Sequence, residues 1–233
     1  MKFAPSKPIL YLITRGVTAE TTTPESQEFK EIVDRVSAAA AAGVDLIQIR
    51  EKRLTARVLF ELARRAVEQA KGTPTQILIN DRADIAAGAG AAGVHLTTQS
   101  IAAATIRRTF GEDFLIGAST HSLEEATTAR EAGANFAVFG PVFETGSKLE
   151  YGSPLGLKAL AEVSRRLAPF PLLALGGIST ENAQACLSNG ASGIAGISLF
   201  ADLEKVKNLE RFALGKESDD PNSLGTQSKN RND

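Results

Sequence analysis

Three cations in this sequence stand shortly after apolar runs, at spacings that would bring them together at one end of a parallel sheet. Arg50 and Lys52 follow the run that begins at Leu46, and Lys148 follows the run that begins at Phe136. Guanidinium and ammonium groups that converge from separate loops form a binding site for an anion. The sequence therefore predicts a site for a small phosphorylated molecule.

The alternation of side chains along a strand indicates where Arg50 points. Gln48 and Arg50 share one face of the predicted strand, and the isoleucines next to Gln48 share the other. If the isoleucines face the covering helices, Gln48 and Arg50 line the interior. A charged side chain there needs a partner, because unpaired burial is costly. The partner is an anionic ligand or, in a structural pair, Asp81 or Glu51.

A pair of glycines, Gly176 and Gly177, ends the apolar run that begins at Pro171. Backbone N–H groups approach a phosphate closely where no side chain intervenes, and parallel barrels often hold phosphate in the loops after strands seven and eight. A tight turn is the alternative explanation. Because the pair lies at the end of the predicted seventh strand, it predicts phosphate binding. Ser179 or Thr180 is expected to cap the helix that follows.

The two histidines each have a structural and a functional interpretation. His95 ends a short strand, where a structural role or a place in the pocket wall is expected. His121 precedes a helix start, so capping or loop packing is favoured over ligand contact. The chain has no nucleophile elbow and no Gly-x-Gly-x-x-Gly or Walker A motif, so no catalytic triad is predicted.

Eight short apolar runs alternate with segments of helical period along the chain. The predicted strands are residues 9–14, 46–50, 76–80, 93–96, 114–119, 136–142, 171–177 and 193–200. Glycines recur where helices give way to strands, at residues 43, 93, 133 and 190, which indicates a reused βα unit. The alternation is typical of parallel βαβ units covered on both faces.

These elements predict an α/β fold, a single-domain (β/α)8 TIM barrel over residues 9–214. Residues 1–8 form a lead-in, and the polar segment 215–233 is expected to be a disordered tail. A length of 233 residues suits such a barrel, which typically takes about 250. A doubly wound open sheet also explains the alternation. Short helix-to-strand connections and uniform composition favour the barrel.

Composition excludes several classes of protein. A formal net charge of -1 offers no field for a nucleic acid backbone. The single cysteine, Cys186, cannot form an internal disulfide and is expected in the core. No apolar stretch reads as a signal peptide or membrane span, so a cytoplasmic protein with small-molecule partners is predicted. The sequence leaves the oligomeric state open, a homo-oligomer included.

The types of these residues and their order along the chain resemble those of the thiamine phosphate synthases. This family belongs to the superfamily that also contains the thiazole tautomerases. The matching segments span residues 9 to about 200. They are residues 48–52, 79–82, 93–96, 119–121, 140–143, 145–148, 174–178 and 197–198. Each segment alone is modest evidence, and together they are specific.

The resemblance implies a transferase that joins a hydroxymethylpyrimidine diphosphate to a thiazole phosphate and releases pyrophosphate, through a dissociative substitution assisted by Mg2+. It assigns the pyrimidine diphosphate to Gln48, Arg50, Lys52, Asn80, Ser119 and Lys148. It assigns the thiazole phosphate to Thr145, Ser147, Gly177, Ile197 and Ser198. Ile49, Glu51 and Gly146 complete the predicted substrate-binding set. Arg50, Lys52 and Lys148 are the expected catalytic residues, because preorganised cations stabilise charge on the departing diphosphate.

One departure from the family pattern concerns the metal. Asp81 matches a magnesium ligand, but Ser100 stands where the family usually has a second aspartate. Magnesium would then be coordinated by Asp81, phosphate oxygens and water, and we expect the protein to bind Mg2+ more weakly than the family pattern implies.

Two alternatives remain, a thiazole tautomerase-like enzyme and a non-catalytic thiazole-phosphate-binding paralogue. The tautomerases have a catalytic histidine where Pro141 stands here and often alter the Asn-Asp pair. Pro141 together with Gln48, Asn80 and Asp81 therefore favours the synthase.

Overall fold

Eight parallel strands close into a barrel in the computed structural model, which describes residues 7–145 and 153–204. The strands follow in chain order around the barrel, and β1 (Ile9–Ile13) pairs with β8 (Gly193–Gly196) to close it. Between them lie β2 (Leu46–Ile49), β3 (Gln76–Asn80), β4 (Gly93–Leu96), β5 (Leu115–Thr120), β6 (Phe136–Phe139) and β7 (Leu172–Ala174). The predicted (β/α)8 barrel is confirmed, and the open sheet is excluded. The predicted end of the barrel at residue 214 and the tail after it lie outside the described residues.

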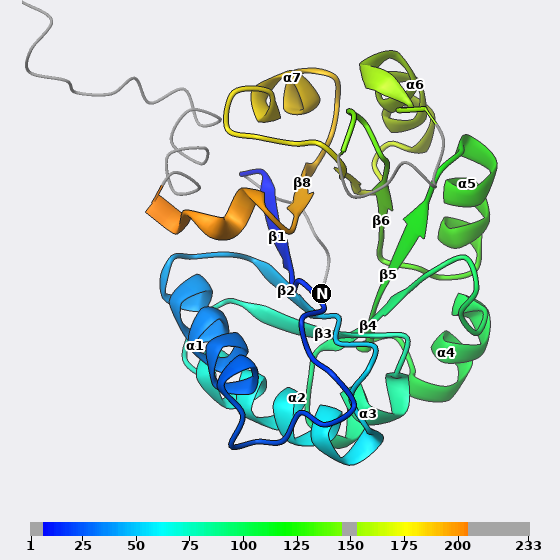
Figure 1. Cartoon of the computed structure of the whole chain (residues 1–233). Coiled ribbons are helices and arrows are strands. Elements are labelled where there is room, and N and C mark those ends of the chain that lie inside the picture. The colour runs from blue at the N-terminus through cyan, green and yellow to red at the C-terminus, as the bar shows by residue number, and fades with distance from the viewer. Residues whose placement is uncertain (1–6, 146–152, 205–233) are drawn as a thin grey trace, which may run out of the picture.

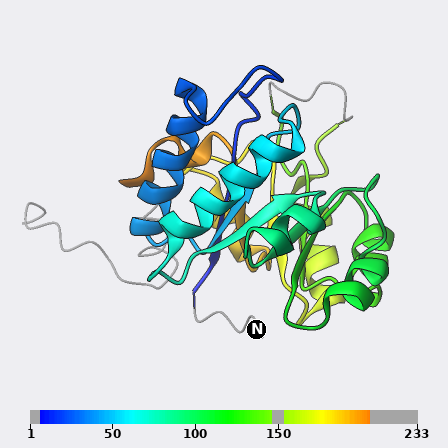
Figure 2. The same cartoon turned by 90° about the horizontal axis from the view of Figure 1, so that it is seen from below.

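The helices surround the strands on the outside of the barrel (Figure 1, and from below in Figure 2). They are α1 (Gln27–Ala41), α2 (Ala56–Ala70), α3 (Ala83–Gly88), α4 (Ala103–Phe110), α5 (Leu123–Glu131), α6 (Gly156–Leu167) and α7 (Ala183–Ser188). A short 3-10 helix, η2 (Leu199–Ala201), follows β8. Each strand is thereby shielded from water on its outer face, which explains why the runs are continuously apolar.

Two separate cores fill the molecule, one between strands and helices and one inside the barrel. Ile47 and Ile49 belong to the outer core, whereas Leu46 belongs to the inner core with Tyr11 and Phe136. Side chains alternate along β2, so Gln48 is on the same side as Leu46 and faces inward. The predicted orientation of Gln48 is confirmed.

Three predicted strands end at least three residues earlier than expected. β6 stops at Phe139 instead of residue 142, β7 at Ala174 instead of 177, and β8 at Gly196 instead of 200. Pro141 has no N–H to donate to a strand ladder, and Gly176 (φ 98°) has left the extended conformation. After β8 the chain turns into η2. The apolar residues beyond these ends lie in loops or in η2, at the C-terminal end of the barrel.

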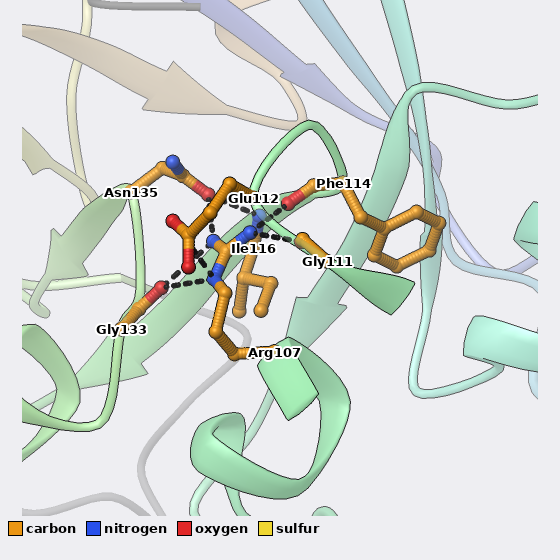
Figure 3. A network of polar contacts seen from close by, with 7 residues as sticks. All are labelled: Arg107, Gly111, Glu112, Phe114, Ile116, Gly133 and Asn135. Atoms are coloured by element: carbon orange, nitrogen blue, oxygen red, sulfur yellow. Dashed lines mark hydrogen bonds and ion pairs between the residues drawn. The ribbon is translucent and has the colours of Figure 1, made fainter. Parts of the chain in front are cut away.

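At the opposite end of the barrel, one arginine connects three segments (Figure 3). Arg107 of α4 donates to the carbonyl oxygens of Gly111 (2.6 Å), Phe114 (2.8 Å) and Gly133 (2.8 Å). It also donates to Oδ1 of Asn135 (2.7 Å), which in turn accepts from the backbone N–H of Ile116. Arg107 thus holds α4 against the segments that begin β5 and β6.

Candidate active site

A cavity of about 280 Å³ lies at the C-terminal ends of the strands. This is the end at which (β/α)8 enzymes carry their active sites. The predicted site residues that line it are Gln48, Arg50, Lys52, Asn80, Ser119, Thr145, Gly177, Ile197 and Ser198. Gly146, Ser147 and Lys148 lie outside the described residues. Residues 100 positions and more apart in sequence therefore meet in one cavity.

Arg50 and Lys52 both line this cavity. Within residues 7–145 and 153–204, no ion pair joins either cation to a carboxylate. The structural pair of Arg50 with Asp81 or Glu51 is therefore not formed. The backbone N–H of Arg50 donates to Oγ1 of Thr14 (2.8 Å), which fixes the start of the loop. Both cations are available to an anionic ligand.

Two residues of the predicted substrate-binding set, Ile49 and Glu51, do not line the cavity. Ile49 is fully buried in the outer core. Glu51 is also buried, and its carboxylate accepts from the backbone N–H groups of Gly16 (3.0 Å) and Thr18 (3.1 Å). Strand alternation directs Ile49 toward the helices, and Glu51 instead anchors the loop after β1. Their predicted place in the substrate site is corrected accordingly.

The candidate metal ligand Asp81 is held by two neighbours. Its Oδ1 accepts from the hydroxyl group of Ser100, and its Oδ2 accepts from Nδ2 of Asn80 (2.7 Å). Asp81 itself has a positive φ of 59° and does not line the cavity, whereas Asn80 does. Asn80 is buried, and its Oδ1 accepts no hydrogen bond from any described residue. A buried acceptor of this kind is costly unless a ligand satisfies it.

A chain of buried polar side chains crosses the barrel interior below the cavity. Nε2 of Gln48 donates to the hydroxyl oxygen of Tyr11 (2.8 Å), which lies 3.1 Å from Nδ1 of His95. Nε2 of His95 lies 2.9 Å from Oγ of Ser119. Gln48, His95 and Ser119 line the cavity, so the expected place of His95 in the pocket wall is confirmed. The role of Tyr11 was not predicted, although Tyr11 shares the inward face of β1 with Ile9 and Ile13.

Burial controls the protonation of this chain. Desolvation lowers the pKa of His95 to about 4; the nearby charge of Arg50 also lowers it, and that of Asp81 opposes the shift. Desolvation likewise raises the pKa of Tyr11 well above its ordinary value, although the hydrogen bond from Gln48 opposes this. Both side chains are therefore neutral at pH 7.

His121 also lines the cavity, at the end of β5. Its Nδ1 lies 2.5 Å from the carbonyl oxygen of Gly140, and its backbone N–H donates to Oε2 of Glu125 (2.6 Å). These contacts confirm the expected loop packing. They also join the loop after β5 to the end of β6.

The glycines after β7 are required by packing between two loops. A Cβ atom on Gly176 would lie 2.5 Å from Cβ of Pro141, and one on Gly177 would lie 2.3 Å from the carbonyl oxygen of Glu144. Both glycines line the cavity, so this close approach shapes its wall. The predicted cap is wrong. Helix α7 begins only at Ala183, after Asn182, whose side chain accepts from the backbone N–H of Ser179 (2.9 Å).

Sequence comparison decides the family. The sequence model of the thiamine monophosphate synthase family matches residues 17–200. The chain belongs to the thiamine monophosphate synthase family. The matched region contains Gln48, Arg50 and Lys52 and every strand except β1.

Relatives that align with most of the chain support membership of the thiamine monophosphate synthase family. A thiamine-phosphate synthase from Chlorobium luteolum is 39% identical over 211 residues, which cover 91% of this chain and 93% of that protein. One from Clostridium novyi is 37% identical, covering 78% of this chain and 89% of its own. The structure of thiamine phosphate pyrophosphorylase from Pyrococcus furiosus superposes with a TM-score of 0.74 at 28% identity, covering 89% and 97% of the two chains. As a member of this family, the chain is a transferase of thiamine biosynthesis.

Side chains that commonly bind metal ions do not gather in the described part of this thiamine monophosphate synthase family member. No cluster of three or more His, Cys, Asp or Glu side chains that could hold a metal ion is found within it. None of the helices in the same ranges is both long enough and apolar enough to span a membrane.

Proposed function

We propose that this transferase joins a hydroxymethylpyrimidine diphosphate to a thiazole phosphate, with release of pyrophosphate. The observation that supports this reaction most strongly is that Arg50 and Lys52 line one cavity with no carboxylate paired to either among the described residues. A diphosphate is the kind of multiply charged group that such cations bind.

The reaction is a dissociative substitution. The bond between the methylene carbon of the pyrimidine and the diphosphate oxygen breaks, and its electron pair leaves with the diphosphate. The pyrimidine methylene cation is trapped by the lone pair of the thiazole nitrogen, which forms the new C–N bond. Arg50 and Lys52 stabilise the charge that grows on the leaving group, and Lys148 is the proposed third cation. This route needs no protein nucleophile.

The polar residues of the cavity suit the two substrates. Gln48, Asn80 and Ser119 offer hydrogen-bonding groups for the pyrimidine diphosphate on the side of β2, β3 and β5. Thr145, Gly177, Ile197 and Ser198 lie on the side of β6, β7 and β8, where we place the thiazole phosphate. Ser147 and Gly146 belong to the same proposed subsite. Two adjacent subsites are what a reaction between two bound molecules requires.

Magnesium is the proposed cofactor, and the residues present fit it with few protein ligands. Mg2+ prefers oxygen donors and is commonly held by one or two carboxylates together with substrate phosphates and water. Asp81 would supply the carboxylate, and Oδ1 of Asn80, a buried oxygen with no donor among the described residues, would be available as a second oxygen ligand. When bound, the ion would neutralise charge on the diphosphate oxygens.

A thiazole tautomerase-like activity and a non-catalytic binding role are the alternatives. In the proposed assay, purified protein is mixed with Mg2+ and with both substrates, and then with each substrate alone, and pyrophosphate is measured. We expect pyrophosphate and thiamine phosphate in equal amounts, and only with both substrates. Thiazole isomerisation without pyrophosphate would indicate a tautomerase. A rise in melting temperature without any product would indicate a binding protein.

A further inference from the structure

The hydrogen-bonded chain of Gln48, Tyr11, His95 and Ser119, here called the relay, connects four strands through the barrel interior. Its bonds measure 2.8, 3.1 and 2.9 Å in that order. Tyr11, Gln48 and His95 are each at most 2% exposed. The ends of the relay, Gln48 and Ser119, line the cavity, whereas Tyr11 does not. Tyr11 can therefore influence a ligand only through its neighbours.

The relay has a direction, which Gln48 sets. Because Nε2 of Gln48 donates to the oxygen of Tyr11, the hydroxyl hydrogen of Tyr11 is free to be donated to Nδ1 of His95. A neutral His95 that accepts at Nδ1 carries its proton on Nε2 and donates it to Oγ of Ser119. The hydroxyl hydrogen of Ser119 is then available for donation to a ligand in the cavity. Oε1 of Gln48 is left for the cavity as well.

Packing prevents the rings of the relay from reorienting. The ring of Phe136 packs edge-on against Tyr11, with centroids 5.6 Å apart and planes at 83°. Gly117 lies beside both His95 and Phe136. A Cβ atom at Gly117 would lie 2.7 Å from Nδ1 of His95 and 2.4 Å from Cζ of Phe136. The rings therefore fill the space that this glycine leaves, so Tyr11 and His95 keep the same hydrogen-bond partners and Gln48 alone sets the direction of the relay.

We propose that Tyr11 and His95 are positioning residues that make Gln48 present an oxygen acceptor, and Ser119 an O–H donor, to an aminopyrimidine. This inference rests on the proposed function, which assigns a pyrimidine to this side of the cavity. An aminopyrimidine carries an N–H donor next to a ring-nitrogen acceptor and so complements the pair. The 4-oxo analogue has a carbonyl acceptor next to a ring N–H, which is the reverse pattern. Sites that read such groups by hydrogen bonds reject the mismatched analogue strongly.

The polarity can be measured without substrate by 15N NMR of histidine-labelled protein. The chain has only two histidines, and a His121→Asn variant identifies the signals of His95. We expect the neutral Nε2–H tautomer of His95 in the unmodified protein and a mixture of tautomers in Tyr11→Phe. An Nδ1–H tautomer in the unmodified protein would reverse the relay and overturn the proposal.

Kinetics test the consequence for the ligand. Tyr11→Phe should raise KM for the pyrimidine diphosphate about tenfold or more and leave KM for the thiazole phosphate unchanged. Its preference for the amino over the 4-oxo substrate should fall by a similar factor. His95→Gln, which retains a donor for Ser119, should recover part of the preference that His95→Leu loses.

Thr75→Val is the matched control, because it also removes one buried hydroxyl group. Oγ1 of Thr75 donates to the carbonyl oxygen of Val44 (2.6 Å) just before β3, at the far end of the barrel. We expect Thr75→Val to lower the melting temperature while KM and substrate preference stay unchanged. Equal KM and preference in Tyr11→Phe and Thr75→Val would refute the positioning role. Absence of turnover in the unmodified protein would refute the proposed function instead, and the NMR result would still decide the polarity.

Discussion

The hydroxyl group of Ser100 donates a hydrogen bond to Oδ1 of Asp81. Ser100 also accepts from the backbone N–H of Thr97 (2.7 Å), so the loop after β4 holds the hydroxyl group in place. The position that the family pattern gives to a second carboxylate is thus taken by a donor to the first. One oxygen of Asp81 is thereby engaged by a neutral hydroxyl group, and the other accepts from Nδ2 of Asn80.

Replacing Ser100 by aspartate should therefore strengthen magnesium binding. A second carboxylate adds an oxygen ligand and a negative charge, and we expect the Mg2+ concentration for half-maximal activity to fall about tenfold. The measurement is a titration of pyrophosphate release against Mg2+, with Ser100→Ala as the control that only removes the hydroxyl group. Half-maximal activity at the same Mg2+ concentration in the unmodified protein and in Ser100→Asp would contradict the assignment of this position.

Arg50→Ala and Lys148→Ala should each lower turnover by about two to three orders of magnitude, because each removes a cation from the leaving diphosphate. Circular dichroism should show an intact barrel. Arg53→Ala is the matched control, since Arg53 is exposed near Lys52 and does not line the cavity. Full activity in both Arg50→Ala and Lys148→Ala would show that the anion site has been placed wrongly.

His95 makes stability depend on pH. Its pKa is lowered from 6.5 to about 4 in the folded protein, chiefly by desolvation. Below pH 6.5 the unfolded chain binds a proton that the folded chain does not, so stability is complete above about pH 6.5 and falls toward pH 4. The loss from this group is on the order of 3 kcal/mol. Urea unfolding from pH 8 to 4 measures it, and His95→Gln should lose less stability over the same range. Identical pH dependence in the two proteins would show that His95 does not carry the effect.

Arg107→Ala should destabilise the barrel without changing the chemistry. The change leaves the carbonyl oxygens of Gly111, Phe114 and Gly133 without this donor at the end of the barrel away from the cavity. We expect a loss of about 3 kcal/mol in the free energy of unfolding, with KM for both substrates unchanged. The control is Arg108→Ala, because Arg108 is the exposed neighbour on α4. A destabilisation no larger than that of Arg108→Ala would mean that the network contributes little.

The sequence predicted the barrel and the floor of its cavity because both follow from local patterns. Eight apolar runs with helical segments between them leave few folds, and the alternation of Leu46, Ile47 and Gln48 fixes which side of β2 faces inward. The glycine pair was also correctly located at the cavity. Its packing role depends on Pro141 and Glu144 in another loop, which no local pattern reveals.

The hydrogen bonds of the relay and the structural role of Glu51 could not be predicted from local patterns. Contact between Tyr11 and His95 depends on how β1 and β4 face each other across the closed barrel. Glu51 has the charge expected of a site residue, yet its carboxylate accepts hydrogen bonds from the backbone N–H groups of Gly16 and Thr18. Ends of strands were overestimated where apolar residues such as Val142 and Phe200 continue past β6 into a loop and past β8 into η2.

The most direct test of the account is a crystal structure with the pyrimidine diphosphate and Mg2+ bound. We predict diphosphate oxygens within hydrogen-bonding distance of the Arg50 guanidinium and the Lys52 ammonium group, with the pyrimidine between Gln48 and Ser119. A diphosphate that binds elsewhere and contacts neither Arg50 nor Lys52 would contradict the proposed anion site. The cavity of about 180 Å³ beside Arg15 and Arg35 is one such place.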